Sequence, residues 1–205
     1  VVPGNGEMIT EAVRGNGAIL VNHEGKRFYN ELETRDNVSA AILKQTDKNA
    51  FLFFDSDMQK SLKATNNYIK QSYTVTGNSL DEIAAKMKVP AAALKQTMTE
   101  YAAAVAAKND KQFGRADLPR PLNKAPFYAI IVTPAVHHCM GGIKIDTKTQ
   151  VYGQNGQIIP GLFAAGEVTG GVHGGNRLGG NAQADIVTFG HIAGQQAYIY
   201  TRLNK

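Results

Sequence analysis

Residues 166–182 read GEVTGGVHGGNRLGGNA, a glycine loop that also carries charged and polar side chains. Seven glycines lie between 166 and 180, so the backbone can approach a flat ligand closely. The loop leads into a helix expected from Asn181 to about Tyr200, whose N-terminus favours negative charge. Arg177 offers a planar fork for a carboxylate or phosphate. An anion-binding loop is therefore favoured over a mobile surface loop, and the lack of Gly-Lys-Ser/Thr argues against a P-loop.

Two adjacent histidines, His137 and His138, follow an apolar run and precede Met140-Gly141-Gly142. Successive side chains on a strand point to opposite faces, so this pair is poorly placed to chelate one metal ion. Two different partners, one on each side of the chain, are the favoured interpretation. The simpler alternative, one buried and one exposed histidine at the end of a strand, stays open.

Hydrophobic periodicity and turn signals predict a mixed fold of the α/β (α+β) class. Expected strands lie at residues 17–22, 27–29, 50–54, 127–132, 142–145 and 162–165, with an Asn155-Gly156 hairpin turn between 151–152 and 157–159. Expected helices lie at 36–44, where Asp36 is the N-cap, at 79–88, opened by a capping box, and from Pro90 to about 108. The polar residues 108–124 are interpreted as a loop or linker.

Composition excludes several classes of protein. With 205 residues, 43% hydrophobic and 19% charged, the chain is typical of a soluble globular protein with a real core. The single cysteine, Cys139, excludes an internal disulfide framework and a cysteine-rich zinc module, and no motif for covalent haem attachment is present. The net charge of +5 suits an anionic ligand. We expect no metal site, no nucleic-acid partner and no membrane-spanning helix.

Acidic and basic residues lie close together in Thr10–Arg14 and in Glu33–Asp36. Solvated ion pairs on the surface are the default interpretation of such residues. Their spacing alone gives no reason to prefer a catalytic role.

Four of these segments together resemble one family. They are residues 10–22 (TEAVRGNGAILVN, continuing to Arg35), 134–142 (PAVHHCMGG), 161–174 (GLFAAGEVTGGVHG) and 176–182 (NRLGGNA). They resemble the soluble FAD-dependent fumarate reductases of the Shewanella flavocytochrome c type, over essentially the whole chain. The last motif is highly specific to the superfamily of FAD-dependent fumarate reductases and succinate dehydrogenases.

The resemblance implies roles for individual residues. Arg35 would give a proton to the substrate carbon, and Glu11 and Arg14 would return a proton to Arg35. The substrate-binding residues implied are Thr10, Glu11, His137, Arg177 and Gly180, and the implied flavin contacts are His138, Glu167, Ala182 and Gln183. Gln183 departs from the small or apolar residue expected at its position, so its contact would come from the backbone.

The resemblance also implies that the chain is part of a longer flavoprotein. Residues 1–128 would form a substrate-capping domain, and 129–205 would form the C-terminal, returning portion of a Rossmann-like FAD-binding domain. The partners implied are fumarate and succinate, an N-terminal FAD-binding segment with a Gly-x-Gly-x-x-Gly unit, and an electron-donating haem domain or cytochrome outside this chain. The expected location is the periplasm. By itself the chain is not expected to hold FAD well or to catalyse a reaction.

The identity of the acid and of the substrate both leave alternatives open. The pKa of histidine lies near neutrality and that of arginine above about 12, so chemistry alone favours His137 as the acid, whereas the resemblance favours Arg35. Urocanate is an alternative substrate, although residues 10–14 are of the dicarboxylate type. A non-catalytic anion-binding module would use only the glycine loop and Arg177. A ketosteroid is less expected, because it has no carboxylate for Arg177.

Overall fold

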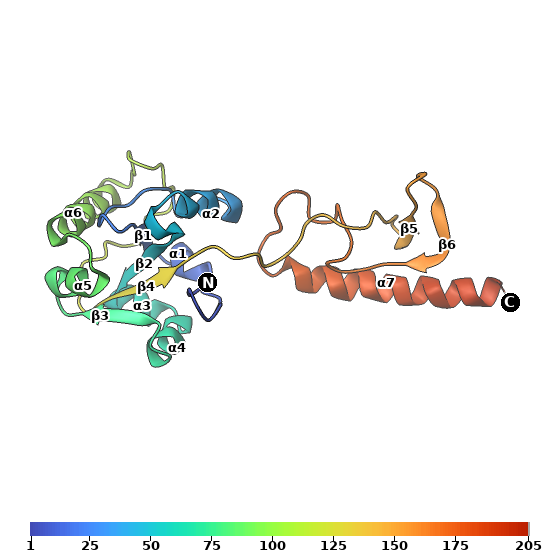
Figure 1. The fold of residues 1–205 in the computed structure, drawn as a ribbon, viewed down its shortest axis with the longest axis horizontal. Helices are drawn as coiled ribbons and strands as arrows, with labels where there is room; N and C mark the ends of the chain where they lie inside the picture. The colour runs from blue at the N-terminus through green and yellow to red at the C-terminus, as the bar shows by residue number, and fades with distance from the viewer. Residues whose placement is uncertain (205) are drawn as a thin grey trace. The chain divides into compact units, whose positions relative to one another are not determined.

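The computed structural model describes residues 1–204, and the chain divides into two units (Figure 1). The first unit spans Val1–Ala135 and the second begins at Val136. Each unit has its own strands and helices. The mixture of helices and antiparallel sheets agrees with the fold class expected from the sequence.

A four-stranded antiparallel sheet in the order β1-β2-β4-β3 organises the first unit. Its strands are β1 (Ile19–Val21), β2 (Ala50–Asp55), β3 (Thr74–Gly77) and β4 (Phe127–Val132). β4 comes last in this unit, yet it pairs with β2 on one side and with β3 on the other. The first unit extends to Ala135 and so includes the whole of β4.

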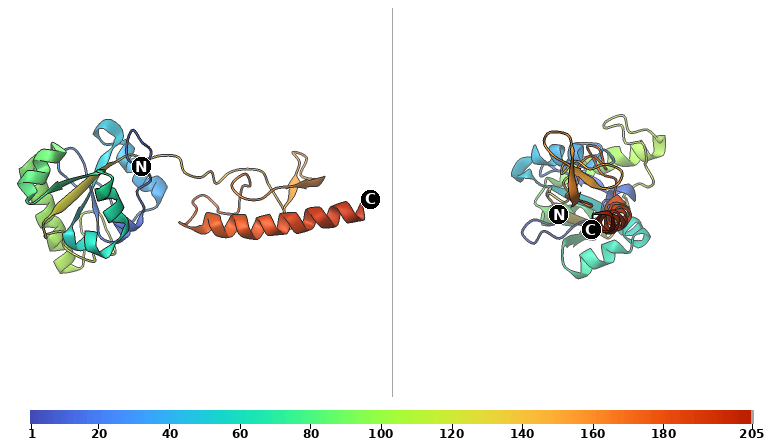
Figure 2. Two further views of the ribbon diagram at one scale, coloured as in Figure 1. Left: turned by 90° about the horizontal axis from the view of Figure 1, so that it is seen from below. Right: turned by 90° about the vertical axis from the view of Figure 1, so that its right-hand side faces the viewer.

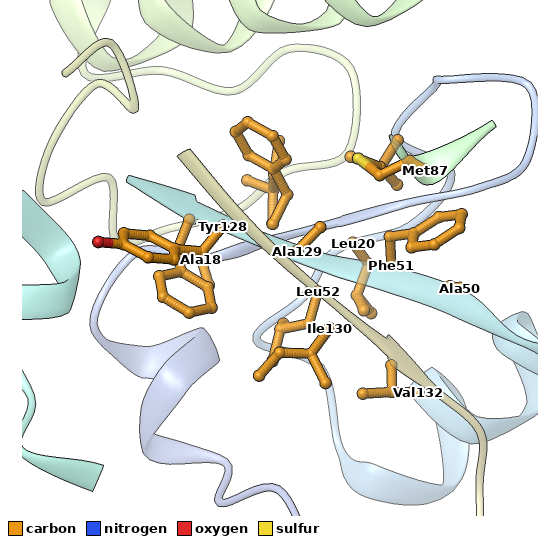
Figure 3. Packing of buried hydrophobic residues seen from close by; sticks show 14 of the residues in the cluster. Ala18, Leu20, Ala50, Phe51, Leu52, Met87, Tyr128, Ala129, Ile130 and Val132 are labelled. Atoms are coloured by element: carbon orange, nitrogen blue, oxygen red, sulfur yellow. The ribbon is translucent and has the colours of Figure 1, made fainter. Parts of the chain in front are cut away.

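The core of the first unit lies around β2 and β4 (Figure 3). All six residues of β2 are buried, as the apolar run predicted. Aromatic rings stack across the two strands, Phe53 on Phe127 at 5.8 Å and Phe54 on Tyr128 at 5.3 Å between ring centres. Such pairs add to the burial of apolar area in holding the strands in register.

Helices surround this sheet. They are α1 (Ala12–Gly15), α2 (Arg35–Leu43), α3 (Ser56–Ser61), α4 (Ala64–Lys70), α5 (Leu80–Met87) and α6 (Ala91–Ala107), with a short 3₁₀ turn, η1, at Thr46–Lys48. Buried Asp55 links two segments, since its carboxylate accepts hydrogen bonds from Met58 N at 2.9 Å and Lys124 N at 3.1 Å. The first bond caps α3.

The starts of α5 and α7 were predicted correctly, whereas that of α2 was not. Ser79 Oγ accepts from Glu82 N at 3.1 Å, so the capping box that opens α5 is confirmed. α2 begins one residue earlier than expected, and Thr34, not Asp36, is its N-cap residue. Thr34 has extended backbone angles, whereas Asp36 lies inside the first turn. A hydrogen bond from Thr34 to the Asp36 carboxylate lowers the pKa of Asp36.

Two expected strands are absent as regular strands. Residues 27–29 contribute only one bridge, Arg27 to Val21, and the pairing does not continue beyond it. Residues 142–145 form only isolated bridges, Ile143 with Thr169 and Ile145 with Val151. The elements α1, α3, α4 and β3 were not predicted.

The second unit combines a hairpin with a long helix. β5 (Gln150–Tyr152) pairs with β6 (Ile158–Phe163) around the predicted Asn155-Gly156 turn, and β6 includes residues expected to form a separate strand at 162–165. α7 (Asn181–Leu203) lies beside β6, as the left view of Figure 2 shows. Phe163 and Tyr200 meet edge to face at 6.2 Å between ring centres. Within residues 1–204, no helix has the combined length and apolar character needed to cross a membrane.

Candidate active site

Three charged residues singled out from the sequence meet in the first unit. Glu11 immediately precedes α1 and Arg14 lies within it, so the two residues are separated by one helical turn. The Glu11 carboxylate accepts a hydrogen bond from Nε of Arg35, the first residue of α2. About a third of the Arg35 side chain and about half of the Glu11 side chain are exposed, at 32% and 45%. This ion pair is therefore accessible to a ligand.

Arg14 lies one turn along α1 from Glu11 and bonds to the protein interior. Its Nη1 donates to the backbone oxygen of Glu31 at 2.7 Å. Burial lowers the pKa of Arg14, and the positive charges of Arg35 and Arg115 act in the same direction, whereas Glu11 and Glu31 oppose the shift. An arginine with a lowered pKa releases a proton more readily than an ordinary one.

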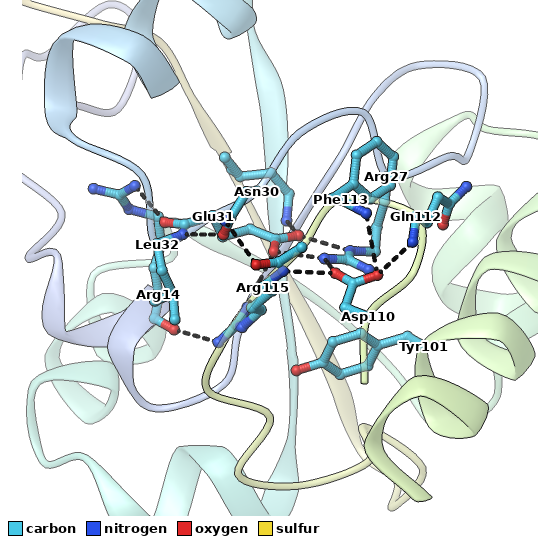
Figure 4. Close-up of polar contacts among 12 residues, drawn as sticks. Arg14, Arg27, Asn30, Glu31, Leu32, Tyr101, Asp110, Gln112, Phe113 and Arg115 are labelled. Atoms are coloured by element: carbon cyan, nitrogen blue, oxygen red, sulfur yellow. Dashed lines mark hydrogen bonds and ion pairs between the residues drawn. The ribbon is translucent and has the colours of Figure 1, made fainter. Parts of the chain in front are cut away.

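Beneath Arg14 lies a buried charge cluster made of Arg27, Glu31, Asp110 and Arg115, each no more than 6% exposed (Figure 4). Arg27 Nη2 lies 2.8 Å from Glu31 Oε2 and 2.9 Å from Asp110 Oδ2. Arg115 Nη1 donates to the same Glu31 oxygen at 3.2 Å. Two arginines and two carboxylates thus neutralise one another away from water.

Aromatic rings and hydrogen bonds hold Arg27 in its charged form. The guanidinium lies 5.0 Å from the ring centres of both Tyr101 and Phe113, within the range of a cation–π interaction. Burial opposes the charge, yet hydrogen bonds and the charges of Glu31 and Asp110 raise the pKa of Arg27 above its ordinary value. Arg27 therefore stays protonated.

Sequence reasoning missed this cluster. The four-residue spacing of Arg27 and Glu31 is also that of an ordinary surface pair, and Asp110 and Arg115 lie in the segment interpreted as a linker. The only available signal was the concentration of arginine and acidic residues beside apolar runs.

Thr10 lies next to Glu11, the N-cap residue of α1. Its hydroxyl accepts from Ala12 N at 3.3 Å, and its own N–H donates to Tyr68 Oη at 3.1 Å. These bonds orient the start of the segment that carries Glu11.

In the second unit, the two-histidine segment lies against the glycine loop through a close approach of backbones. Ile143 N donates to Val168 O at 2.8 Å, and Gly170 N donates to Ile143 O at 3.0 Å. A Cβ at Gly142 would lie 2.3 Å from Val168 O, so only glycine fits there. This contact between the two segments brings His138 close to Glu167.

His138 and Glu167 meet at this contact. His138 Nδ1 lies 3.5 Å from Glu167 Oε2, and Glu167 Oε1 accepts from Cys139 N at 3.0 Å. The His138 ring meets the edge of His173 at 5.4 Å between ring centres, and His173 Nε2 lies 3.0 Å from Asp185 Oδ2 on α7. His173 and Asp185 were not singled out from the sequence. His137 is exposed.

The N-terminus of α7 is built from the end of the glycine loop. Gly180 is its N-cap residue, with φ of +84°, a left-handed conformation that suits glycine. Ala182 and Gln183 lie in the first turn, and Arg177 is buried four residues before the helix begins at Asn181. Arg177 Nη1 donates to Leu178 O at 3.1 Å. The helix spans 23 residues, so its N-terminal N–H groups and dipole form an anion-favouring end.

Several buried polar atoms of this unit have no hydrogen-bond partner within residues 1–204. They are His138 Nε2, Arg177 Nε and Asp185 Oδ1. Buried polar atoms are normally paired, so these point to groups supplied by a ligand or by further protein. Within the same described residues, no group of three or more His, Cys, Asp or Glu side chains is placed to hold a metal ion.

The chain matches a known protein family over most of its length. The family model for the FAD binding domain matches residues 1–182. The chain belongs to the FAD binding domain family. The chain is also 54% identical over 199 residues to the fumarate reductase (cytochrome) of Shewanella frigidimarina, covering 97% of this chain and 35% of that protein.

A second protein sequence and a solved structure also match most of the chain. An NADH:fumarate oxidoreductase of Klebsiella pneumoniae is 47% identical over 191 residues, covering 93% of this chain and 21% of that protein. The solved structure of the open conformation of a flavocytochrome c3 fumarate reductase has a TM-score of 0.79 and 44% identity, covering 98% of this chain and 36% of that chain. The chain thus spans about a third of the length of the Shewanella fumarate reductase.

The second unit fits the cofactor named by its family. Open space lies beyond the Cα atoms of Gly171, Gly174, Gly175 and Gly180, where an added Cβ would meet nothing within 4 Å. The N-terminus of α7 and the unpartnered, buried Arg177 Nε are hydrogen-bond donors, which is the kind of group that the oxygen and nitrogen acceptors of a flavin require.

Proposed function

We propose that the chain is the C-terminal part of an FAD-dependent fumarate reductase, which reduces fumarate to succinate. The observation that carries this proposal is the accessible Glu11–Arg35 ion pair backed by Arg14, whose pKa is lowered. A proton donor connected to further protonatable groups is what the reduction of a carbon–carbon double bond requires. The identity to named fumarate reductases supports the same substrate.

Substrate binding is assigned to Arg177, His137 and Gly180 of the second unit and to Thr10 and Glu11 of the first unit. Arg177 provides a guanidinium fork that matches a carboxylate, and its buried Nε has no protein partner within residues 1–204. A guanidinium bound to a carboxylate of fumarate polarises the carbon–carbon double bond and stabilises the negative charge that develops on the substrate.

Bound FAD in its reduced form would supply a hydride to one alkene carbon of fumarate. Arg35 then gives a proton from its guanidinium to the neighbouring carbon, which completes the addition of one hydride and one proton. Glu11 returns a proton to Arg35 through the hydrogen bond that joins them. Arg14 in turn supplies Glu11 and regains its own proton from water, and its lowered pKa makes the transfer to Glu11 easier.

Flavin contacts are assigned to His138, Glu167, Ala182 and Gln183. The last two lie in the first turn of α7, where free N–H groups favour negative charge on a flavin ring. We also propose an electron-donating haem domain or cytochrome, which the word cytochrome in the names of the Shewanella relatives supports. A periplasmic location belongs to the same proposal.

The 205-residue chain by itself is expected to bind FAD weakly. It contains no strand–Gly-x-Gly-x-x-Gly–helix unit for the pyrophosphate, and it spans about a third of its Shewanella relative. Titration of the purified chain with FAD, followed by flavin fluorescence, measures the affinity. Tight binding of one FAD per chain would contradict the need for a further segment.

In the complete protein, Arg177→Ala is expected to weaken fumarate binding and slow turnover. Loss of a charged carboxylate contact should cost about 2–4 kcal/mol of transition-state stabilisation. Fumarate-dependent oxidation of a reduced dye gives kcat/KM, with urocanate as the comparison substrate.

Arg202→Ala, at an exposed arginine near the other end of α7, is the matched control and should keep the parent kinetics. Fumarate kinetics of Arg177→Ala within threefold of the parent would remove Arg177 from the site. A parent protein that reduces urocanate but not fumarate would overturn the proposed substrate.

A further inference from the structure

Arg14 is held at both of its ends by two residues that also hold each other. Its backbone oxygen accepts from Arg115 Nη2 at 2.8 Å, and its Nη1 donates to Glu31 O at 2.7 Å. Arg115 Nη1 donates to Glu31 Oε2 at 3.2 Å, which closes the ring of contacts (Figure 4). The position of Arg14 therefore depends on the Arg115–Glu31 pair.

That pair is itself fixed to the sheet. Arg115 also donates to Ala18 O at 2.9 Å and to Asp117 O at 2.8 Å. The Glu31 carboxylate accepts from Leu20 N, in β1, at 3.3 Å. Arg115 and Glu31 are 2% and 0% exposed, so neither side chain has room to move.

α1 cannot provide this rigidity by itself. It has four residues, a single turn, and such a short helix is not stable without tertiary contacts. The same turn places Glu11 and Arg14 relative to each other, and Glu11 pairs with Arg35 on α2. Whatever holds α1 in place thus sets the geometry of all three residues.

We propose that Arg115 is a positioning residue that, together with Glu31, fixes Arg14 and α1 in the arrangement in which a proton passes to Arg35. This inference rests on the proposed function. Arg115 touches neither Glu11 nor Arg35 through any contact described within residues 1–204, so it acts through Arg14 rather than by transferring the proton.

The other half of the buried charge cluster provides a matched comparison. The Asp110 carboxylate is bonded to Arg27 and to backbone N–H groups of residues 112, 113 and 115. These described contacts do not include Arg14. A change at Asp110 therefore disturbs the same cluster, at similar burial, without removing a hydrogen bond to Arg14 itself.

The test uses the complete, FAD-containing protein with Arg115→Lys and Asp110→Asn. An ammonium keeps the charge beside Glu31, but it lacks the planar fork that reaches Arg14 O, Ala18 O and Glu31 together. We expect kcat for fumarate reduction to fall about 10- to 100-fold in Arg115→Lys, because a small displacement of a reacting group has effects of that size. KM should stay within about threefold, since neither residue binds substrate, and the solvent deuterium isotope effect on kcat should rise.

Asp110→Asn should lower the melting temperature at least as much as Arg115→Lys while keeping kcat within about twofold of the parent. Loss of kcat in both variants in proportion to their melting temperatures would overturn the inference and leave the cluster a purely structural one. If Arg115→Lys yields no FAD-containing protein, Glu31→Gln is measured under the same criteria. A parent protein inactive with fumarate would overturn the proposed function first, whereas an active parent with an unaffected Arg115→Lys would overturn this inference alone.

Discussion

Arg35→Ala is expected to abolish fumarate reduction almost completely, while FAD content and fumarate binding survive. A general acid contributes about 10²- to 10⁴-fold to a rate, and the loss is larger where no other group can replace it. His137→Ala should keep measurable turnover, because the role assigned to His137 is binding and polarisation. Pre-steady-state reoxidation of the reduced flavin by fumarate, with FAD occupancy measured first, separates the two residues.

Lys86→Ala is the matched control for Arg35→Ala. It removes an exposed ion pair, Lys86 with Glu82 at 2.7 Å, that lies on α5 and has no role in the proposed chemistry. Its kinetics should equal those of the parent. Fast reoxidation in Arg35→Ala together with none in His137→Ala would reverse the assignment and make the histidine the acid.

Glu31→Ala is expected to destabilise the first unit by about 3–5 kcal/mol. The substitution leaves Arg27 and Arg115 buried beside each other with Asp110 as the remaining carboxylate of the cluster. An uncompensated buried charge costs far more than the hydrogen bonds alone. Equilibrium urea unfolding of the parent and variant chains, followed by far-ultraviolet circular dichroism, gives the difference in the free energy of unfolding.

Glu24→Ala is the comparison for this experiment. Glu24 pairs with Lys26 at 3.3 Å, and the Glu24 side chain is 68% exposed. Removing an exposed pair changes stability by less than about 1 kcal/mol. Equal losses in Glu24→Ala and Glu31→Ala would show that the buried charge cluster contributes no more than a surface pair.

Local signals predicted the elements whose structure depends on neighbouring residues. Three predicted features are present: the apolar run of β2, the capping box of α5 and the Asn155-Gly156 turn. The residues that determine each of them lie within the feature itself. β3 was missed because it is short and partly polar, and its partner β4 lies far along the chain. The strand expected at 27–29 is reduced to a single bridge between Arg27 and Val21.

The candidate site shows the same division. The glycine loop and Arg177 could be singled out from residue types alone, whereas roles for Glu11, Arg14 and Arg35 came only with the family resemblance. Glu11 and Arg35 are 24 residues apart in the chain, and no local rule brings them together. The buried charge cluster escaped prediction since a charged residue is most often exposed, and burial of four such residues depends on the completed fold.

The central place of β4 has a consequence for how the chain folds as it leaves the ribosome. β1 and β2 can pair early. β4, which lies between β2 and β3 in the sheet, is synthesised only after α5, α6 and residues 108–126. Closing so long a loop precedes any contact energy, so completion of the sheet is a late step. Until β4 is synthesised, β2 presents an unpaired apolar edge to neighbouring nascent chains. A chain that stops before Phe127 keeps that edge open permanently and is the form of this protein most exposed to aggregation.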